Sequence, residues 1–191
     1  MAAWHELLAR PLEGSLVTLE PLRERHYDAL REAGADPVAW RWMVVDNVED
    51  WLARGPEVDG RIAYATLVGG VPMGSTSFLA LSEENRRIEI GATWLAPSAW
   101  SSGANVEAKL LMLRRAFDEL GCLRVEFKTD ALNERTRGSL AALPAQFEGI
   151  HRRHMLVRGG QRRDSAWYSV LVDEWPEVRA NLERRLAAKL A

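Results

Sequence analysis

Residues 87–130 are the part of the chain that most narrows the possible folds. They contain an apolar run (RIEIGATWL), a loop with Pro, Ser and Gly, a long helical pattern, and a second alternating run (LRVEFKTD). Two strands joined by a helix can lie parallel in one sheet, and such crossovers are right-handed in nearly all proteins. The stretch therefore predicts a strand–helix–strand crossover and favours a mixed α/β fold.

The helix in this stretch is predicted from the spacing of its apolar residues. They recur at steps of four and three, and Gly121 then provides a stop signal. We expect one apolar stripe along the helix, formed by Val106, Leu110, Leu113, Phe117 and Leu120. After the helix, Val125 and Phe127 alternate with charged residues, as in a strand with one buried face.

The other predicted elements are further strands and short helices, so the expected fold class is α+β (mixed α/β). Alternating hydrophobicity predicts strands at 15–21, 61–68, 71–81, 145–157 and 163–172. Caps, prolines and apolar spacing predict helices at 23–33, 48–53, 133–143 and 177–190.

Composition limits the domain number, the partners and the compartment. The chain has 191 residues, of which 47% are hydrophobic, and we predict a single domain over 1–191. Within it, 1–14 is an N-terminal extension and 176–191 a C-terminal helix. The net charge of −2 favours neither nucleic acid nor a membrane as a partner. A single cysteine, and no signal-peptide or membrane-spanning run, favour a cytoplasmic location.

The loop before the long helix has the character of an anion site. The first amides of a helix lack partners and carry partial positive charge, which suits phosphate. Small residues allow a close approach of the ligand, and they are Ser101, Ser102, Gly103 and Ala104, followed by Asn105. A simple turn with no ligand is the alternative.

Four stretches together resemble the GCN5-related N-acetyltransferase (GNAT) superfamily, in particular its branch of ribosomal-protein alanine acetyltransferase-like proteins. They are EIGATWLAPSAWSSGANVEAKLLMLRRAFDELG, RVEFKTDALNERTRGSLAAL, QFEGIHRRHM and DSAWYSVLVDEW. The resemblance implies a central, mostly antiparallel, twisted sheet of about seven strands with helices on both faces. It also implies that the crossover carries an acetyl-CoA site, that acetyl-CoA is the acyl donor, and that no metal is needed.

The resemblance assigns cofactor contacts to several residues. Backbone groups near Trp94 and Leu95 would bind the pantetheine arm, and Asn133 would contact the cofactor near its amide groups. The pyrophosphate would be surrounded by Trp100, Ser101, Ser102, Gly103, Ala104 and Asn105. The family loop usually begins with Gln or Arg and ends with Gly or Ala, whereas Trp100 and Asn105 occupy these positions here.

Two residues are candidates for catalysis. Glu89 lies between two isoleucines, where a lone carboxylate is costly, and it would accept a proton through water or orient the amine. Its structural alternative is a salt bridge to an arginine such as Arg87 or Arg124. Thr136 would hydrogen-bond the departing sulfur, since the predicted helix lacks the tyrosine that many relatives use as the acid. Ordinary helix-start roles for Asn133 and Thr136 are the alternative.

The acceptor is the least defined part of the prediction. We expect the region of Trp40, Arg41 and Trp42, together with the last hairpin, to line its site. A protein N-terminal amine is favoured by the resemblance, a small-molecule amine comes next, and transfer would be direct within a ternary complex. A homodimer through the last hairpin or helix stays open.

Two other functions fit parts of the sequence. The arginine-rich hairpin 151–163 would suit nucleic acid, but a solvated hairpin tip is favoured in an acidic chain. A non-catalytic acyl-CoA-binding module is the other alternative. Cys122 is expected to be a packing residue rather than a nucleophile. His151 and His154 should point to opposite faces of a strand and bind no metal.

Overall fold

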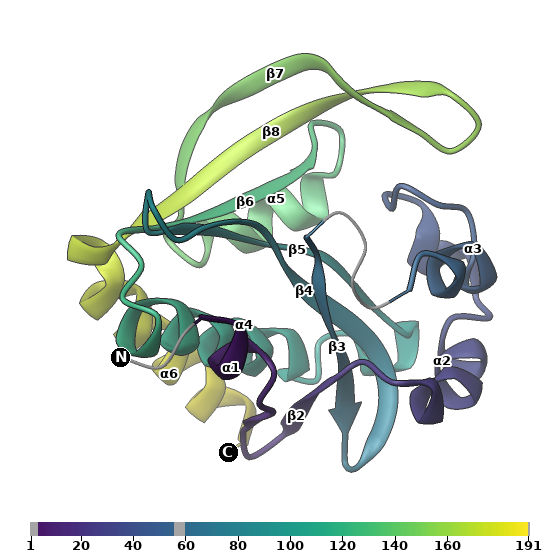
Figure 1. The fold of residues 1–191 in the computed structure, drawn as a ribbon, viewed down its shortest axis with the longest axis horizontal. Coiled ribbons are helices and arrows are strands. Elements are labelled where there is room, and N and C mark those ends of the chain that lie inside the picture. Colours follow the sequence, from purple (N-terminus) through teal and green to yellow (C-terminus); the bar gives the residue numbers. More distant parts are fainter. Residues whose placement is uncertain (1–3, 56–59, 191) are drawn as a thin grey trace.

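A computed structural model describes residues 4–55 and 60–190 and contains one eight-stranded sheet (Figure 1). The strand order is β1-β2-β3-β4-β5-β6-β8-β7, and only the β5–β6 pair is parallel. The strands are β1 (Leu12–Glu13), β2 (Val17–Pro21), β3 (Ile62–Val68), β4 (Val71–Ser82), β5 (Arg87–Leu95), β6 (Arg124–Asp130), β7 (Gln146–Val157) and β8 (Gln161–Leu171).

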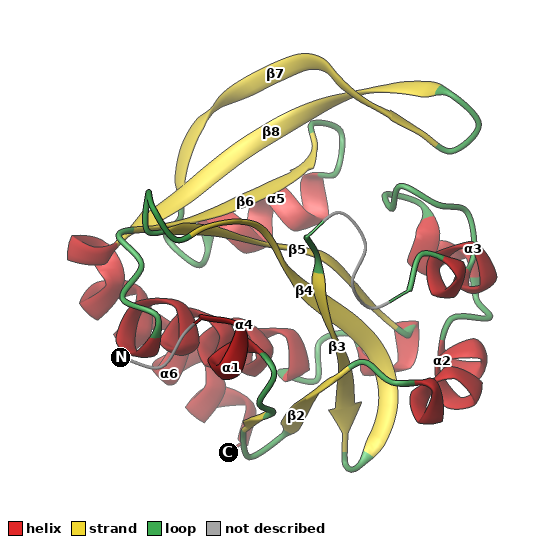
Figure 2. Cartoon of the chain, in the orientation of Figure 1, coloured by secondary structure: helices red, strands yellow, loops and turns green. Residues whose placement is uncertain are grey.

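Helices lie on both sides of the sheet (Figure 2). They are α1 (Trp4–Leu8), α2 (Tyr27–Ala33), α3 (Val48–Ala53), α4 (Ala104–Arg114), α5 (Glu134–Ala141) and α6 (Trp175–Leu190). The helix α4 connects the parallel strands β5 and β6, which confirms the predicted crossover and the mixed α+β class. None of the helices within residues 4–55 and 60–190 is long and apolar enough to cross a membrane.

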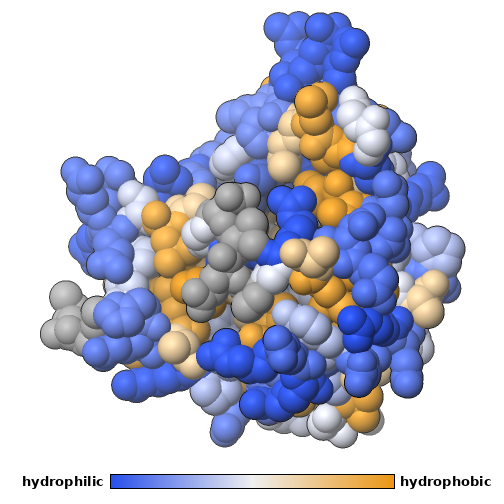
Figure 3. Space-filling model, turned by 45° about the vertical axis from the view of Figure 1, so that its right-hand side comes forward, coloured by the Kyte–Doolittle hydropathy of each residue, from blue (hydrophilic) through white to orange (hydrophobic). Residues whose placement is uncertain are grey.

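Two hydrophobic cores hold the helices against the sheet. The larger core joins α1, α4 and α6 to the sheet, and the smaller joins α2 and α3 to β3 and to Trp94 of β5. On the face drawn in Figure 3, hydrophobic residues form separate areas bordered by hydrophilic ones. Most large apolar side chains are therefore used in packing the helices onto the sheet.

The predicted N-terminal extension contributes to the fold. The short strand β1 pairs with β2, which makes eight strands where about seven were expected. Leu8 and Leu12 are buried in the larger core, and the Trp4 indole Nε1 donates to the Leu120 carbonyl at 3.1 Å. A two-residue strand and a five-residue helix are too short to give a periodic signal in the sequence.

The prediction of a single apolar stripe on the long helix is wrong. Of the predicted residues, all except the half-buried Val106 are buried. Ala108, Leu111 and Met112, which lie outside the predicted stripe, are buried as well. The sheet covers one side of α4, and α6 packs on another, so most of its circumference is enclosed. A π-helical turn, Arg115–Glu119, then ends the helix.

The strands β5 and β6 separate soon after they begin to pair. Their register includes only Arg87 with Arg124, Ile88 with Val125 and Glu89 with Glu126. Beyond this point β5 follows β4 as far as Leu95, while β6 follows β8 as far as Asp130. We call this divergence of the two strands beyond Glu89 the β5–β6 split, and on its β5 side the chain continues into the loop before α4.

Candidate active site

The loop before α4 has the geometry of an anion site. Gly103 is the N-cap of α4 with φ of 96°, a conformation that glycine adopts most easily. A Cβ at this position would lie 2.9 Å from Leu16 Cδ1 and 3.2 Å from Lys189 Cβ. Both the backbone angle and the space therefore require glycine.

Three amides of this loop are available to a ligand. Within the part of the chain that the structure describes, the N–H groups of Ser101, Ser102 and Gly103 have no acceptor. The Ser102 hydroxyl donates to the Ala99 carbonyl at 2.8 Å and accepts from Ala104 N–H at 3.2 Å. The loop thus holds its own shape while its successive amides are left for an anion.

Asn105 belongs to the first turn of α4 and contacts a lysine that the sequence analysis overlooked. Lys109 lies one turn further along, and its Nζ donates to Asn105 Oδ1 at 3.0 Å. Burial, with the charge of Arg185, lowers the pKa of Lys109 to about 8. Helical side chains lean toward the helix start, so this ammonium is directed at the loop.

Trp94 and Leu95, whose backbone groups were predicted to bind the pantetheine arm, have different surroundings in the structure. The Trp94 side chain is packed in the smaller core, with its ring centroid 4.7 Å from that of Trp40. The Leu95 carbonyl already accepts a hydrogen bond of 2.9 Å from the Trp100 indole. Arg135 of α5 stacks on Trp100 at 3.6 Å, so the first residue of the loop is tied to the β6 side of the split.

Asn133 and Thr136 occupy the start of α5, at the end of β6. The Asn133 side chain accepts from Thr136 N–H at 3.1 Å, as an N-cap does. The Thr136 hydroxyl is half-buried and has no hydrogen-bond partner among residues 4–55 and 60–190. It therefore stays free to contact a ligand at this end of the split.

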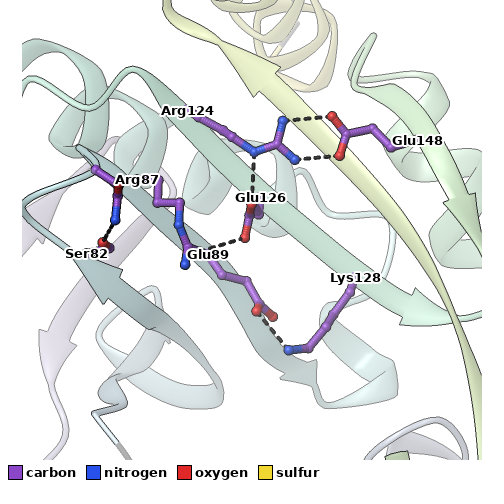
Figure 4. Close-up of polar contacts among 8 residues, drawn as sticks. Ser82, Arg87, Glu89, Arg124, Glu126, Lys128 and Glu148 are labelled. Carbon is purple, nitrogen blue, oxygen red and sulfur yellow. Dashed lines mark hydrogen bonds and ion pairs between the residues drawn. The ribbon is translucent and has the colours of Figure 1, made fainter. Parts of the chain in front are cut away.

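Glu89 lies where β5 and β6 part, and it pairs with a lysine, not with either arginine of the structural alternative. Lys128 Nζ is 2.9 Å from Glu89 Oε2 (Figure 4). Burial raises the pKa of Glu89, and the charge and hydrogen bond of Lys128 partly oppose this. A carboxylate with a raised pKa beside an opening is a common arrangement for a general base.

The two predicted arginine partners are used elsewhere. Arg124 forms ion pairs with Glu126 and Glu148, and Arg87 lies 3.4 Å from Glu126 Oε2 (Figure 4). The cross-strand register explains this, because Arg87, Glu89, Arg124, Glu126 and Lys128 share one sheet face, which we call the charged face. Glu89 is the member of this network that lies at the split.

Only part of the region predicted to bind the acceptor is exposed at the surface. Trp40 is 2% exposed and donates to the Gly34 carbonyl at 2.8 Å, so its placement in the acceptor site is wrong. The sequence around Trp40 does not show that it is buried, because the same pattern is compatible with a tryptophan in the core and with one that lines a cleft. Arg41 is exposed, and its guanidinium lies 5.1 Å from the centroid of the half-buried Trp42 ring.

The tip of the last hairpin contacts this region. Arg158, at the tip between β7 and β8, donates through Nη1 to the carbonyls of Arg41 and Met43 at 2.6 and 2.8 Å. Its own amide donates to the Val44 carbonyl at 3.2 Å. The hairpin tip and the 41–44 segment therefore face each other across one side of the molecule.

The two histidines of the hairpin are side by side, so the prediction of opposite faces is wrong. Their ring centroids are 5.7 Å apart, and both contact the Trp167 ring. A bulge causes this, since the five residues of β7 from His151 to Met155 lie opposite only three of β8, from Arg163 to Ser165. No cluster of three potential metal-binding side chains occurs in the described ranges.

Cys122 is fully buried, and burial raises the pKa of its thiol to about 12. A thiol with such a pKa is protonated at neutral pH and is a poor nucleophile.

The arginines of the 151–163 segment do not share one surface. Arg158 bonds to the 41–44 segment, and Arg163 is buried. Arg152, Arg153 and Arg162 are exposed.

Comparison with known proteins gives the same family as the sequence resemblance. A family model described as "Acetyltransferase (GNAT) domain" matches residues 17–143. No curated protein matches the chain. This chain therefore belongs to the GNAT acetyltransferase family, whose members are N-acetyltransferases, and the predicted family and enzyme class are confirmed.

Solved structures agree along nearly the whole chain. A structure assigned as an acetyltransferase is 39% identical, with a TM-score of 0.86 and 92% of this chain and 93% of that chain covered. A GCN5-related N-acetyltransferase from Brucella melitensis is 30% identical, with a TM-score of 0.87 and coverage of 93% and 86%. Mycobacterium smegmatis RimJ in complex with CoA-disulfide is 21% identical, with a TM-score of 0.74 and coverage of 92% and 93%, and shares the fold.

Proposed function

We propose that this protein transfers an acetyl group from acetyl-CoA directly to a primary amine within a ternary complex. The β5–β6 split carries the proposal, because it begins at Glu89 and leads to three unpartnered amides at Ser101, Ser102 and Gly103. The split gives an extended thioester arm a place between two strands. The loop amides then suit the pyrophosphate at its other end.

The chemistry needs one group that accepts the amine proton and another that contacts the departing sulfur. The amine nitrogen attacks the thioester carbonyl carbon, the carbon–sulfur bond breaks, and the amine proton passes to Glu89, directly or through water. Lys128 holds the Glu89 carboxylate in place at 2.9 Å. The Thr136 hydroxyl donates a hydrogen bond to the sulfur as CoA thiolate leaves, and the proton that Glu89 has taken from the amine then passes through water to the thiolate, which completes the thiol.

A protein N-terminal amine is the favoured acceptor, and a small-molecule amine comes next. The preference rests on the resemblance of the sequence to ribosomal-protein alanine acetyltransferase-like proteins. The acceptor would approach beside the contact between the hairpin tip and the exposed Arg41. We propose the cytoplasm as the compartment because the chain has only one cysteine, and it is buried.

An acyl-CoA-binding module without transfer activity is the second candidate. It is favoured by the Trp100 hydrogen bond to the Leu95 carbonyl, which occupies a backbone group expected to bind the cofactor. The lack of a tyrosine in α5 also favours it. This candidate predicts binding of acetyl-CoA without release of thiol.

The deciding experiment measures CoA thiol release with a panel of peptide N-terminal amines and small amines. We expect acceptor-dependent release, with kcat in Glu89→Gln reduced about 100-fold or more while the Kd for acetyl-CoA stays within twofold. Glu134→Gln, at an exposed position on α5, is the matched control. Acetyl-CoA binding without release on any acceptor would favour the binding module instead.

A further inference from the structure

Arg163 of β8 is a buried cation that has no hydrogen-bond or ion-pair partner in the described part of the chain. Its residue is 7% exposed, and its Nε is buried without a hydrogen bond. No ion pair or side-chain hydrogen bond links Arg163 to any residue in the ranges 4–55 and 60–190. Burying a guanidinium without a counter-ion is costly, so such a residue is retained where something else supplies the negative charge.

Arg163 lies on the charged face, close to the proposed reaction centre. Residues alternate along β8, so Arg163 shares its face with Ser165 and Trp167. Trp167 pairs directly with Lys128, the residue that holds Glu89. Lys128 Nζ also lies 5.3 Å from the Trp167 ring centroid. The sheet therefore places Arg163 along the same surface as the Glu89–Lys128 pair.

The carboxylates nearest to Arg163 are engaged by other groups. Asp130 and Glu89 both act on the Arg163 charge, yet Asp130 Oδ1 accepts from Leu132 N–H at 2.9 Å and Glu89 is held by Lys128. Arg158 adds a like charge. Burial lowers the pKa of Arg163, and the negative charges of Asp130 and Glu89 only partly oppose this.

His154 and His151 complete the surroundings on the β7 side. The ring of His151 stacks on Trp167 at 4.9 Å, and that of His154 meets Trp167 edge-on at 5.6 Å. Lys128, His151 and Arg163 all add positive charge near His154, and with burial they lower its pKa. Positive groups thus dominate this end of the charged face.

We propose that Arg163 binds an anionic group of the acceptor, a carboxylate or a phosphate, while the acceptor amine lies at Glu89. The planar guanidinium suits two-point binding of either anion. The inference rests on the proposed acetyl transfer to an amine and specifies the chemical class of that amine. Acidic acceptors would be selected over neutral acceptors of the same shape.

The test uses pairs of acceptors that differ only in the anionic group. The pairs are Ala-Asp-amide with Ala-Asn-amide, β-alanine with its amide, and phosphoethanolamine with ethanolamine. Both kcat/KM and calorimetric binding to the CoA-saturated protein are measured, so that a weak substrate still gives a result. The variants are Arg163→Gln and Arg163→Lys, and Arg162→Gln on the opposite face of the same strand is the control.

We expect the anionic member of at least one pair to be preferred about tenfold or more, as a charge-assisted bidentate contact provides. Arg163→Gln should abolish the preference, Arg163→Lys should keep part of it, and Arg162→Gln should leave it intact. Acetyl-CoA affinity should not change in any variant, which separates this role from a structural one.

Equal kcat/KM and equal binding for the two members of every pair would overturn the proposal. Failure of every acceptor to bind would overturn it too. A preference that survives in Arg163→Gln would overturn it as well. Failure of the proposed function is distinct from these results, because the protein would then fail to bind acetyl-CoA, or would bind it and release no thiol with any amine.

Discussion

Glu89 shows how a single residue at the end of a strand pair gains a chemical role. Its carboxyl is 2% exposed, at the last position where β5 and β6 are paired. Burial raises its pKa, and Lys128 keeps the ionised form accessible. The balance between these two effects sets the pH at which Glu89 can accept a proton.

This balance predicts the acidic limb of the rate profile. Because only the ionised carboxylate accepts a proton, kcat/KM should rise as pH increases through the Glu89 pKa, above the ordinary value of 4.5. Lys128→Met removes the opposing charge, so the limb should move to higher pH. The measurement is kcat/KM against pH for both proteins, with Arg87→Met as control. A limb that does not move would contradict the role of Lys128.

Lys109 gives a second pH dependence, this time in cofactor binding. Its pKa is lowered to about 8 by burial and Arg185, and a phosphate at the loop would raise it again. Acetyl-CoA binding should therefore take up a proton, and affinity should fall severalfold as pH rises from 8 toward 10. Calorimetric Kd values for wild type and Lys109→Met test this. Equal pH dependence in the two proteins would exclude Lys109 from the site.

At the scale of the elements, Glu107 fixes the chain before β2 to the helix α4. Its carboxylate accepts from the amides of Ser15, Leu16 and Val17 at 2.8, 2.6 and 2.7 Å, and from the Ser15 hydroxyl at 2.7 Å. Burial would raise the pKa of Glu107, but these hydrogen bonds outweigh it, and the pKa is lowered. The ionised carboxylate therefore stabilises the folded state.

Glu107→Gln should lower the free energy of unfolding by about 1–3 kcal/mol, since its amide group would face backbone donors. Urea denaturation at neutral pH measures this, with the exposed Glu134→Gln as control. A folded-state pKa below the unfolded value gives stability above the unfolded pKa that is lost as pH falls through the folded pKa. The difference in free energy of unfolding between wild type and Glu107→Gln should therefore shrink as pH falls. A difference that grows on acidification would contradict this account.

In the proposed function, the hairpin β7–β8 closes the acceptor side. Arg158→Ala removes two hydrogen bonds to the Arg41 and Met43 carbonyls. We expect the KM for the amine to rise about tenfold, while the Kd for acetyl-CoA stays unchanged. Arg152→Ala, an exposed arginine on β7, is the control. An equal effect of both substitutions would show that the tip contact does not organise the acceptor site.

The elements that could be predicted are those long enough to show a periodic pattern of apolar residues. The crossover from β5 through α4 to β6, the hairpins and α3 follow from apolar spacing and turn residues, and Gly103 was found because loop shape depends on it. Lys128 and Arg163 were not identified as site residues, because their roles depend on which strands become neighbours. Equally, no pattern reveals the bulge that brings His151 to His154.

At the scale of the whole molecule, one irregularity of the sheet organises the site. The parting of β5 from β6 exposes the end of the pairing at Glu89 and leads to the loop before α4. In the proposed function, the loop and α5 bind the donor, while the charged face and the hairpin bind the acceptor; Figure 1 shows where α5 and the hairpin strands β7 and β8 lie. Donor and acceptor would then meet at the split.

The most direct test of this account is calorimetric titration of the purified protein with acetyl-CoA, with desulfo-CoA and ATP as comparison ligands. Gly103→Glu adds bulk and negative charge where a Cβ already meets Leu16, and Gly138→Glu, in open space on α5, is the control. The account predicts micromolar binding of acetyl-CoA that is abolished in Gly103→Glu and kept in Gly138→Glu. Absence of binding to the wild-type protein, or equal binding to all three proteins, would contradict it.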